Sequence, residues 1–489
     1  MPISAKDTFA IRQTLREIKD AAAHKAADPP DLETLYTPET HEKALDPDRA
    51  LVVGNRGVGK SLWASVLADP RARLRATVDY PRLGLSKADV VLGFHEAAGK
   101  TDDPAPSPER LRLLLAGGFD PEAIWRGVLL QALGSRTGLI LPDSLSEVLT
   151  WVHNNLDAAE AGLRKADADL RVAGRRFVLL FDALDRLGGD WTTIRRLSEG
   201  LLRFALDLRG YKAIRVKLFM RTDQARDDRL FQFPDASKLR AERVELLWRQ
   251  VDLYGLLYGH LWHSASAGES FRRLVTQATR GAVRGGPGEP LPRALATDEK
   301  VQAAVIGAIS SPYMGSNSRQ GWTYSWLHTH LADAFLETNP RSFLIALRKA
   351  AQQVKDDVSN VLDHHAIRDG VREASSVRVD QLKEDYPWIL AVLSPLAELE
   401  VPCPRSKFIE CWRNAGTIAT LEGLTQNQHQ LGPVELADHP PKPAEALLSA
   451  LQNIGVVEQR KDGKINVPDI FRVAARLKRR GGMRPPSKR

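Results

Sequence analysis

Eight residues at 54–61 have the types and the spacing to bind a chain of phosphates. The pattern is G-x-x-x-x-G-K-[ST], in which glycines let the backbone curl so that successive N–H groups point at one anion. Lys60 would bring a positive charge to the outer phosphates, and the Ser61 hydroxyl would be a ligand of Mg²⁺. We predict that the whole stretch binds ATP with Mg²⁺, the alternative being a structural Gly-rich turn. Its residues are Gly54, Asn55, Arg56, Gly57, Val58, Gly59, Lys60 and Ser61.

A carboxylate on a neighbouring strand would complete the magnesium site. The apolar run 177–181 ends directly before Asp182, and ligands of parallel sheets gather at the carboxyl ends of strands. We therefore expect Asp182 to hold Mg²⁺ through water, unless it only caps the next helix. Asp185 would orient the attacking water or support the site, or else be a turn residue before Arg186. Because Ala183, and not an acid, follows Asp182, we expect slow hydrolysis.

One arginine is placed to reach the γ-phosphate. The strand-like run 214–219 leads to Arg221, beside the strand that carries Asp182. A guanidinium at this strand end could stabilise the charge that develops on the transferred phosphoryl group. The alternative interpretation is an ordinary surface arginine.

These side chains need a sheet to bring them to one edge. Between about 49 and 262, apolar runs alternate with helical patterns, which predicts a parallel sheet with helices on both faces. The octapeptide then lies where a strand ends and a helix begins, so the positive end of the helix faces the phosphates. The expected strands are 50–53, 90–94, 176–181, 214–219 and 244–248.

The length of 489 residues predicts several folding units. We expect an N-terminal helix and linker at 1–48, the sheet domain at 49–262, a helical domain at 263–385 and a last domain at 386–489. In the last domain the turn Lys461-Asp462-Gly463 separates two strand-like runs, which is a strong hairpin signal. A helix followed by a hairpin is typical of a winged helix.

The net charge of +8 is concentrated in the C-terminal tail. Eight of the 69 Lys and Arg residues lie at 471–489, and the rest of the chain is formally neutral because Asp and Glu together number 61. We expect a helix from Asp469 to present Arg472, Arg476 and Arg479 to a phosphate backbone, the alternative being a solvated tail. No apolar run reaches about 18 residues and no signal peptide is evident, so we expect a cytoplasmic protein without a membrane role.

Four segments together resemble one family. "VVGNRGVGKS", "FVLLFDALDR", "KLFMRTD" and "ETNPRSFLIALRKA" are similar to segments of the STAND and KAP-like branch of prokaryotic P-loop ATPases, relatives of AAA+ proteins. The resemblance implies an α/β P-loop NTPase domain followed by a helical lid domain and a C-terminal winged-helix domain. It also implies an Asp-x-x-Asp magnesium motif at Asp182 and Asp185, and Arg221 at the end of the fourth strand. Arg341 would start the lid helix and sense the γ-phosphate.

Three functions are compatible with these expectations. The resemblance implies an ATPase switch that couples nucleotide state to assembly in an anti-phage or other conflict system, as a homo-oligomer or with a separate effector protein. The second is an AAA+-like loader, partition or transposition regulator that grips double-stranded DNA with its winged helix and basic tail. The third is a nucleotide-binding scaffold without useful turnover.

Overall fold

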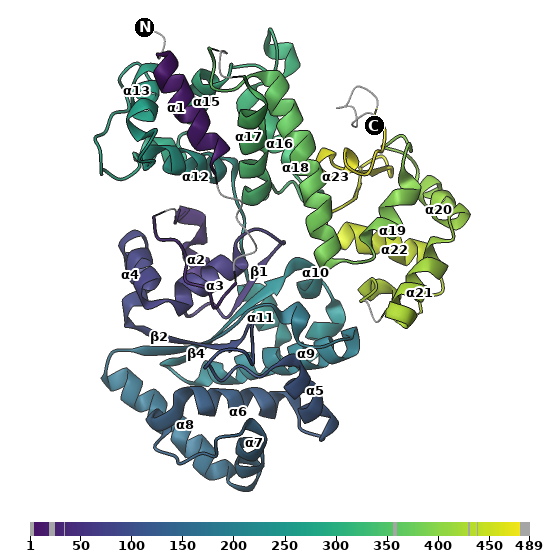
Figure 1. Cartoon of the computed structure of the whole chain (residues 1–489). Coiled ribbons are helices and arrows are strands. Elements are labelled where there is room, and N and C mark those ends of the chain that lie inside the picture. Colours follow the sequence, from purple (N-terminus) through teal and green to yellow (C-terminus); the bar gives the residue numbers. More distant parts are fainter. Residues whose placement is uncertain are drawn as a thin grey trace. The chain divides into compact units, whose positions relative to one another are not determined.

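The computed structural model describes residues 4–18, 25–33, 35–355, 359–428, 431–437 and 439–479. They form two compact units, one from the described residues of 23–247 and one from those of 1–22 and 248–489 (Figure 1). We call them the sheet unit and the helical unit. The bounds at 1–48, 49–262, 263–385 and 386–489 remain a prediction.

The sheet unit is built on five parallel strands in the order β2-β3-β4-β1-β5. The predicted parallel sheet is thus confirmed, although its second strand starts two residues earlier than expected and its fifth is much shorter. Because β4 lies between β3 and β1 and all three strands are parallel, their carboxyl ends are neighbours at one edge of the sheet. The strands are β1 (Leu51–Gly54), β2 (Ala88–Phe94), β3 (Arg176–Phe181), β4 (Ile214–Arg221) and β5 (Val244–Glu245).

Helices cover both faces of this sheet. On one face α3 (Lys60–Ala68) packs against β2, β3 and β4, and α4 (Pro70–Asp79) follows it. On the other lie α6 (Pro121–Leu133) and α8 (Leu156–Val172) (Figure 1). The main core of the unit forms on that second face, where alternate strand residues pack with helix residues, including α9 (Trp191–Asp207).

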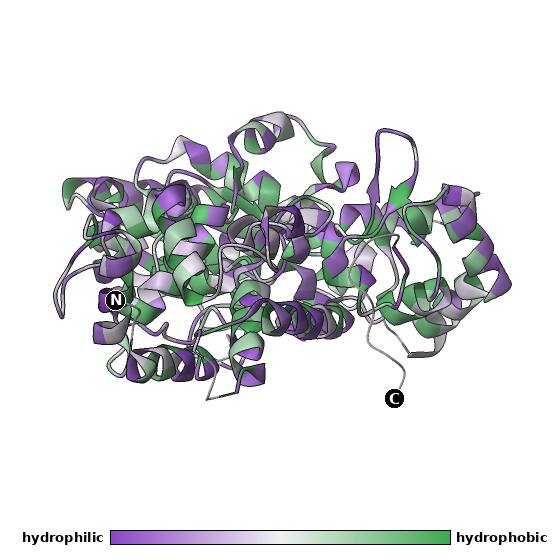
Figure 2. Cartoon of the chain, turned by 90° about the horizontal axis from the view of Figure 1, so that it is seen from above, coloured by the Kyte–Doolittle hydropathy of each residue, from purple (hydrophilic) through white to green (hydrophobic). Residues whose placement is uncertain are grey.

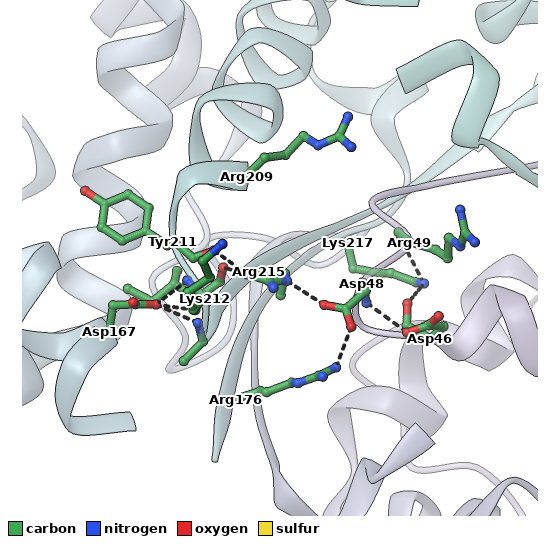
Figure 3. A network of polar contacts seen from close by, with 12 residues as sticks. Asp46, Asp48, Arg49, Asp167, Arg176, Arg209, Tyr211, Lys212, Arg215 and Lys217 are labelled. Atoms are coloured by element: carbon green, nitrogen blue, oxygen red, sulfur yellow. Dashed lines mark hydrogen bonds and ion pairs between the residues drawn. The ribbon is translucent and has the colours of Figure 1, made fainter. Parts of the chain in front are cut away.

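A polar network joins β4 to the segment before β1 (Figure 3). Lys217 is fully buried in β4, and its Nζ donates to the carbonyl oxygens of Asp46 at 2.7 Å and Arg49 at 2.8 Å. Burial lowers the pKa of Lys217 to about 7, with the nearby Asp46 opposing this shift. Asp48 forms ion pairs with Arg176 at 3.0 Å and Arg215 at 2.7 Å. The network therefore fixes where the chain enters β1.

The helical unit combines the N-terminal helix α1 (Ala5–Arg16) with the C-terminal half of the chain. The buried Arg12 side chain donates to the carbonyl oxygens of Lys355 at 2.9 Å and Val361 at 3.1 Å. Most helices carry hydrophilic and hydrophobic residues together (Figure 2). Among the described residues, no helix has the length and apolar character needed to cross a membrane.

The longer helices of this unit are bounded as follows: α12 (Gln250–Trp262), α13 (Gly268–Ala278), α15 (Glu299–Ile309), α16 (Thr323–Leu331), α17 (Pro340–Gln353), α18 (His364–Asp385), α20 (Arg405–Asn414), α21 (Thr417–Gln428) and α22 (Pro443–Asn453).

The C-terminal region has the predicted hairpin but not the predicted basic helix. Strands β6 (Glu458–Gln459) and β7 (Ile465–Asn466) pair antiparallel. Helix α23 (Asp469–Arg472) ends after one turn. Arg472 is fully buried and donates to Asp469 at 2.7 Å and to the Leu477 carbonyl oxygen at 3.1 Å. The expected cationic helix face was therefore wrong at Arg472, which is a core residue, whereas Arg476 and Arg479 are exposed but lie beyond the end of the helix. The tail from Arg480 to Arg489 lies outside the described residues.

Candidate nucleotide-binding site

The octapeptide forms the turn between β1 and α3. Gly57 and Gly59 have φ angles of 79° and 99°, which residues with a Cβ rarely adopt. A Cβ on Gly54 would lie 2.8 Å from Val58 Cγ2, so this glycine is needed for the buried Val58 to fold over the strand end. The helix begins at Lys60, directly after Gly59. Strand, glycine turn and helix N-terminus thus occur in the order that phosphate binding requires.

Lys60 lies over this turn. Its Nζ donates to the carbonyl oxygens of Gly54 at 2.7 Å and Asn55 at 2.8 Å. Burial lowers the pKa of Lys60 to about 8, and the positive charge of Arg221 acts in the same direction, while Asp182 opposes both. The ammonium group therefore lies among the other predicted site residues.

Ser61 and Asp182 meet as the magnesium prediction requires. Their side chains lie close enough for Ser61 to act on the Asp182 carboxyl, and Asp182 is 2 % exposed at the end of β3. Burial raises the pKa of Asp182, whereas the Ser61 side chain and the charge of Lys60 oppose this rise. The Asp182 backbone N–H donates to the Phe94 carbonyl oxygen at 2.9 Å, which holds the carboxylate at the strand end.

This pair suits Mg²⁺ bound together with phosphates. Mg²⁺ prefers oxygen ligands and usually takes one or two from the protein, with water and phosphate oxygens completing its octahedron. A hydroxyl beside a buried carboxylate supplies that donor set. In the described part of the chain, no group of three or more His, Cys, Asp or Glu side chains could hold a metal alone. The residues present therefore fit a metal that arrives with a nucleotide.

Asp185 and Arg221 form an ion pair at the edge of the sheet beside the glycine turn. Arg221 Nη1 is 3.2 Å from Asp185 Oδ2, and the same guanidinium donates to Asp223 from Nε at 3.0 Å and from Nη2 at 2.8 Å. Burial raises the pKa of Asp185, but the positive charge of Arg221, the hydrogen bond from the Asp185 backbone N–H and the charges of Arg186 and Lys60 together outweigh it, so the net pKa is lowered. Arg221 is 9 % exposed, so the surface-arginine alternative is wrong.

Sequence reasoning missed Asp223 as part of the site. The only signal was its place two residues after Arg221 in "RTD". A second unexpected feature is Ala183, whose φ of 56° lies in the left-handed region. This conformation turns the chain sharply between Asp182 and the short 3₁₀ turn Leu184–Arg186.

Arg341 lies in the helical unit. Its backbone N–H donates to Asn339 Oδ1 at 2.7 Å, and Asn339 caps α17, with Pro340 as the first helical residue. The expected start of a helix at this motif is confirmed. Contact of Arg341 with a γ-phosphate remains a prediction, as do the nucleotide contacts of Asn55 and Arg56.

No protein-family model and no curated protein matches the chain. Among solved structures it is similar to the Walker-type ATPase PABY2304 of Pyrococcus abyssi, with 12 % identity and a TM-score of 0.31 over 90 % of this chain and 97 % of that one. It is also similar to the ORC2 protein of Aeropyrum pernix in its ADPNP–ADP complexes, with 12 % identity and a TM-score of 0.30 over 93 % of each chain. Scores this low carry no argument about the chain. The α/β P-loop NTPase fold of the sheet unit rests on its own strand order and on the glycine turn between β1 and α3.

Proposed function

We propose that the protein binds ATP with Mg²⁺ at the carboxyl edge of the sheet and hydrolyses it slowly. The observation that carries this proposal is the glycine turn before α3, with Ser61 at the start of that helix and the buried Asp182 at the end of β3. The turn and the N-terminus of α3 would hold the phosphates, and Lys60 would neutralise the outer ones. The metal, when bound, would neutralise charge between the outer phosphates.

Two further groups support hydrolysis. Asp185 would accept a proton from the attacking water or orient it, and Arg221 would stabilise charge on the γ-phosphate. Ala183 occupies the position directly after Asp182 and supplies no acid or base. Slow turnover suits a switch better than a motor. Coupling of that switch to a homo-oligomer or to a separate effector, in an anti-phage or other conflict system, belongs to the proposal.

Isothermal titration with ATP and Mg²⁺ tests the nucleotide site directly. Lys60→Ala should lower the affinity at least tenfold because the charge facing the outer phosphates is lost. Lys87→Ala is the matched control, since Lys87 is an exposed lysine of the same unit. Equal affinity of the wild type and the Lys60 variant would remove the nucleotide proposal.

Duplex DNA binding by the helical unit is a second candidate. It is supported by the exposed hairpin turn, which carries Arg460, Lys461 and Lys464, because clustered cations release counterions from a phosphate backbone. The buried Arg472 takes no part in such a surface. Helix α22, which precedes the hairpin, bears Glu445 and no Lys or Arg. We therefore rank this candidate below the ATP switch.

A further inference from the structure

Arg221 lies beside the glycine turn because of the register of the sheet. Gly54 and Arg221 are Cα partners at the carboxyl ends of the paired strands β1 and β4. The Arg221 side chain is nearly enclosed, at 10 % exposure, and its positive charge acts on Lys60. A phosphate chain held by the turn would therefore be attracted by both Lys60 and Arg221.

Asp223 fixes the direction of this guanidinium. Its two carboxylate oxygens accept from Nε at 3.0 Å and from Nη2 at 2.8 Å. Two parallel hydrogen bonds of this kind set the plane of an arginine as well as its position. The third nitrogen, Nη1, then faces Asp185 Oδ2 at 3.2 Å.

The Asp185 pair is the weaker side of this arrangement. It has one hydrogen bond at 3.2 Å, whereas Asp223 makes two shorter ones. The Asp185 side chain is 22 % exposed, compared with 10 % for Asp223. A competing anion would therefore displace Asp185 from Arg221 before it displaced Asp223.

We infer that the γ-phosphate of ATP competes with Asp185 for the Nη1 edge of Arg221, and that Asp223 is the positioning residue that keeps this edge turned toward the site. The inference rests on the proposed ATP site and specifies how that site distinguishes ATP from ADP. ADP lacks the competing phosphate and leaves the Arg221–Asp185 pair in place. ATP breaks the pair, so the carboxylate of Asp185 is released only when a phosphate is present to be hydrolysed.

Nucleotide preference provides the test. Affinities for ADP and for the non-hydrolysable β,γ-imido analogue of ATP would be measured with Mg²⁺ by isothermal titration in the full chain. Asp223→Asn should lower the preference for the ATP analogue roughly tenfold, because the guanidinium loses its charged anchor. Asp185→Asn should raise that preference several-fold, because the competitor loses its charge. In both variants the ADP affinity should stay within about twofold of wild type.

Asp227→Asn is the matched control. Asp227 accepts from Arg229 Nε at 2.8 Å, also two residues away in the chain, and from Arg195 at 3.1 Å. Its side chain is 13 % exposed. The Asp227→Asn variant loses ion pairs similar to those of Asp223, but outside the proposed site. An effect that comes only from lower folding stability would therefore also be seen in this variant. Its preference for the ATP analogue over ADP should equal that of the wild type.

The outcomes separate the inference from the function on which it rests. If the wild type binds neither nucleotide, the proposed function and the inference both fail. If the wild type binds both and neither Asp223→Asn nor Asp185→Asn changes the preference, the ATP site stands and the inference is overturned. A preference that shifts in opposite directions in the two variants, with Asp227→Asn unchanged, supports the exchange.

Discussion

The Ser61 side chain at the start of α3 lies beside the carboxyl group of Asp182 at the end of β3, where it opposes the rise in pKa that burial causes. We predict that Asp182→Asn keeps most of its affinity for nucleotide but loses its dependence on Mg²⁺, because the amide has a similar shape and no charge. Titrating ATP into each protein with Mg²⁺ and with a chelator measures this dependence.

Asp143→Asn is the control for this prediction, since Asp143 is an exposed acid of the same unit. If Mg²⁺ strengthens ATP binding by the same factor in Asp182→Asn as in the wild type, Asp182 is not the magnesium residue.

Ala183 provides a test of backbone strain beside the site. Its φ of 56° is costly for any residue with a Cβ. Ala183→Gly should therefore raise the free energy of unfolding by about 1 kcal/mol, which chemical denaturation would detect. Ala173→Gly, at an exposed position with a φ of −73°, should have the opposite sign. A loss of stability in both variants would show that Ala183 is not strained.

Lys217 should make stability depend on pH. Burial lowers the pKa of Lys217 from 10.5 to about 7, so between these values the unfolded chain binds more protons than the folded one. Stability from this group therefore rises with pH across that window and is smallest below it. Relative to Lys217→Met, the wild type should gain about 2 kcal/mol between pH 7 and pH 9.

Urea unfolding of both proteins at pH 7, 8 and 9 checks this. The methionine variant also leaves the carbonyl oxygens of Asp46 and Arg49 without the Lys217 donor, which shifts its stability by a similar amount at every pH. A difference between the two proteins that does not change with pH would contradict the buried titration.

Deleting 480–489 tests the DNA candidate. The deletion leaves Lys478 in place. The backbone of Lys478 forms a parallel β-bridge with Glu400, and its side chain forms an ion pair with Glu398 at 2.7 Å. If the tail meets phosphates, the truncated protein should bind duplex DNA more weakly. Its salt slope should also shrink by about 0.9 log units per lost contact. Fluorescence anisotropy at several salt concentrations measures both, and unchanged affinity and slope would end the tail-based hypothesis.

The sequence predicts the sheet and the positions of Ser61 and Asp182 at its edge, for a local reason. Buried parallel strands are continuous apolar runs, and the residue after such a run must lie at the carboxyl edge. Ser61 and Asp182 could therefore be placed together without knowledge of the packing. The enclosure of Arg221 could not be predicted in this way, because its partners Asp185 and Asp223 lie in loops that follow two different strands.

The predicted exposure of Arg472 on a C-terminal helix was wrong for a related reason. Helical spacing places Arg472 on a polar face. The spacing does not show that the Arg472 side chain donates to Asp469 and to the Leu477 carbonyl oxygen in the folded unit. Periodicity describes one element and contains no information about distant partners. The association of α1 with the C-terminal half was missed in the same way, since its contacts are long-range.

The separation of α1 from its partners in the sequence also limits the order in which the two units can fold during synthesis. Arg12 and the Val361 carbonyl oxygen that it contacts are 349 residues apart. At ribosomal speeds of about 5 to 20 residues per second, the first helix waits roughly 20 to 70 seconds for that partner to emerge. During this time the apolar side chains of Ile11 and Leu15, which are buried in the finished unit, remain exposed on the nascent chain. The whole sheet unit is synthesised in that interval, so it can fold before the helical unit can close.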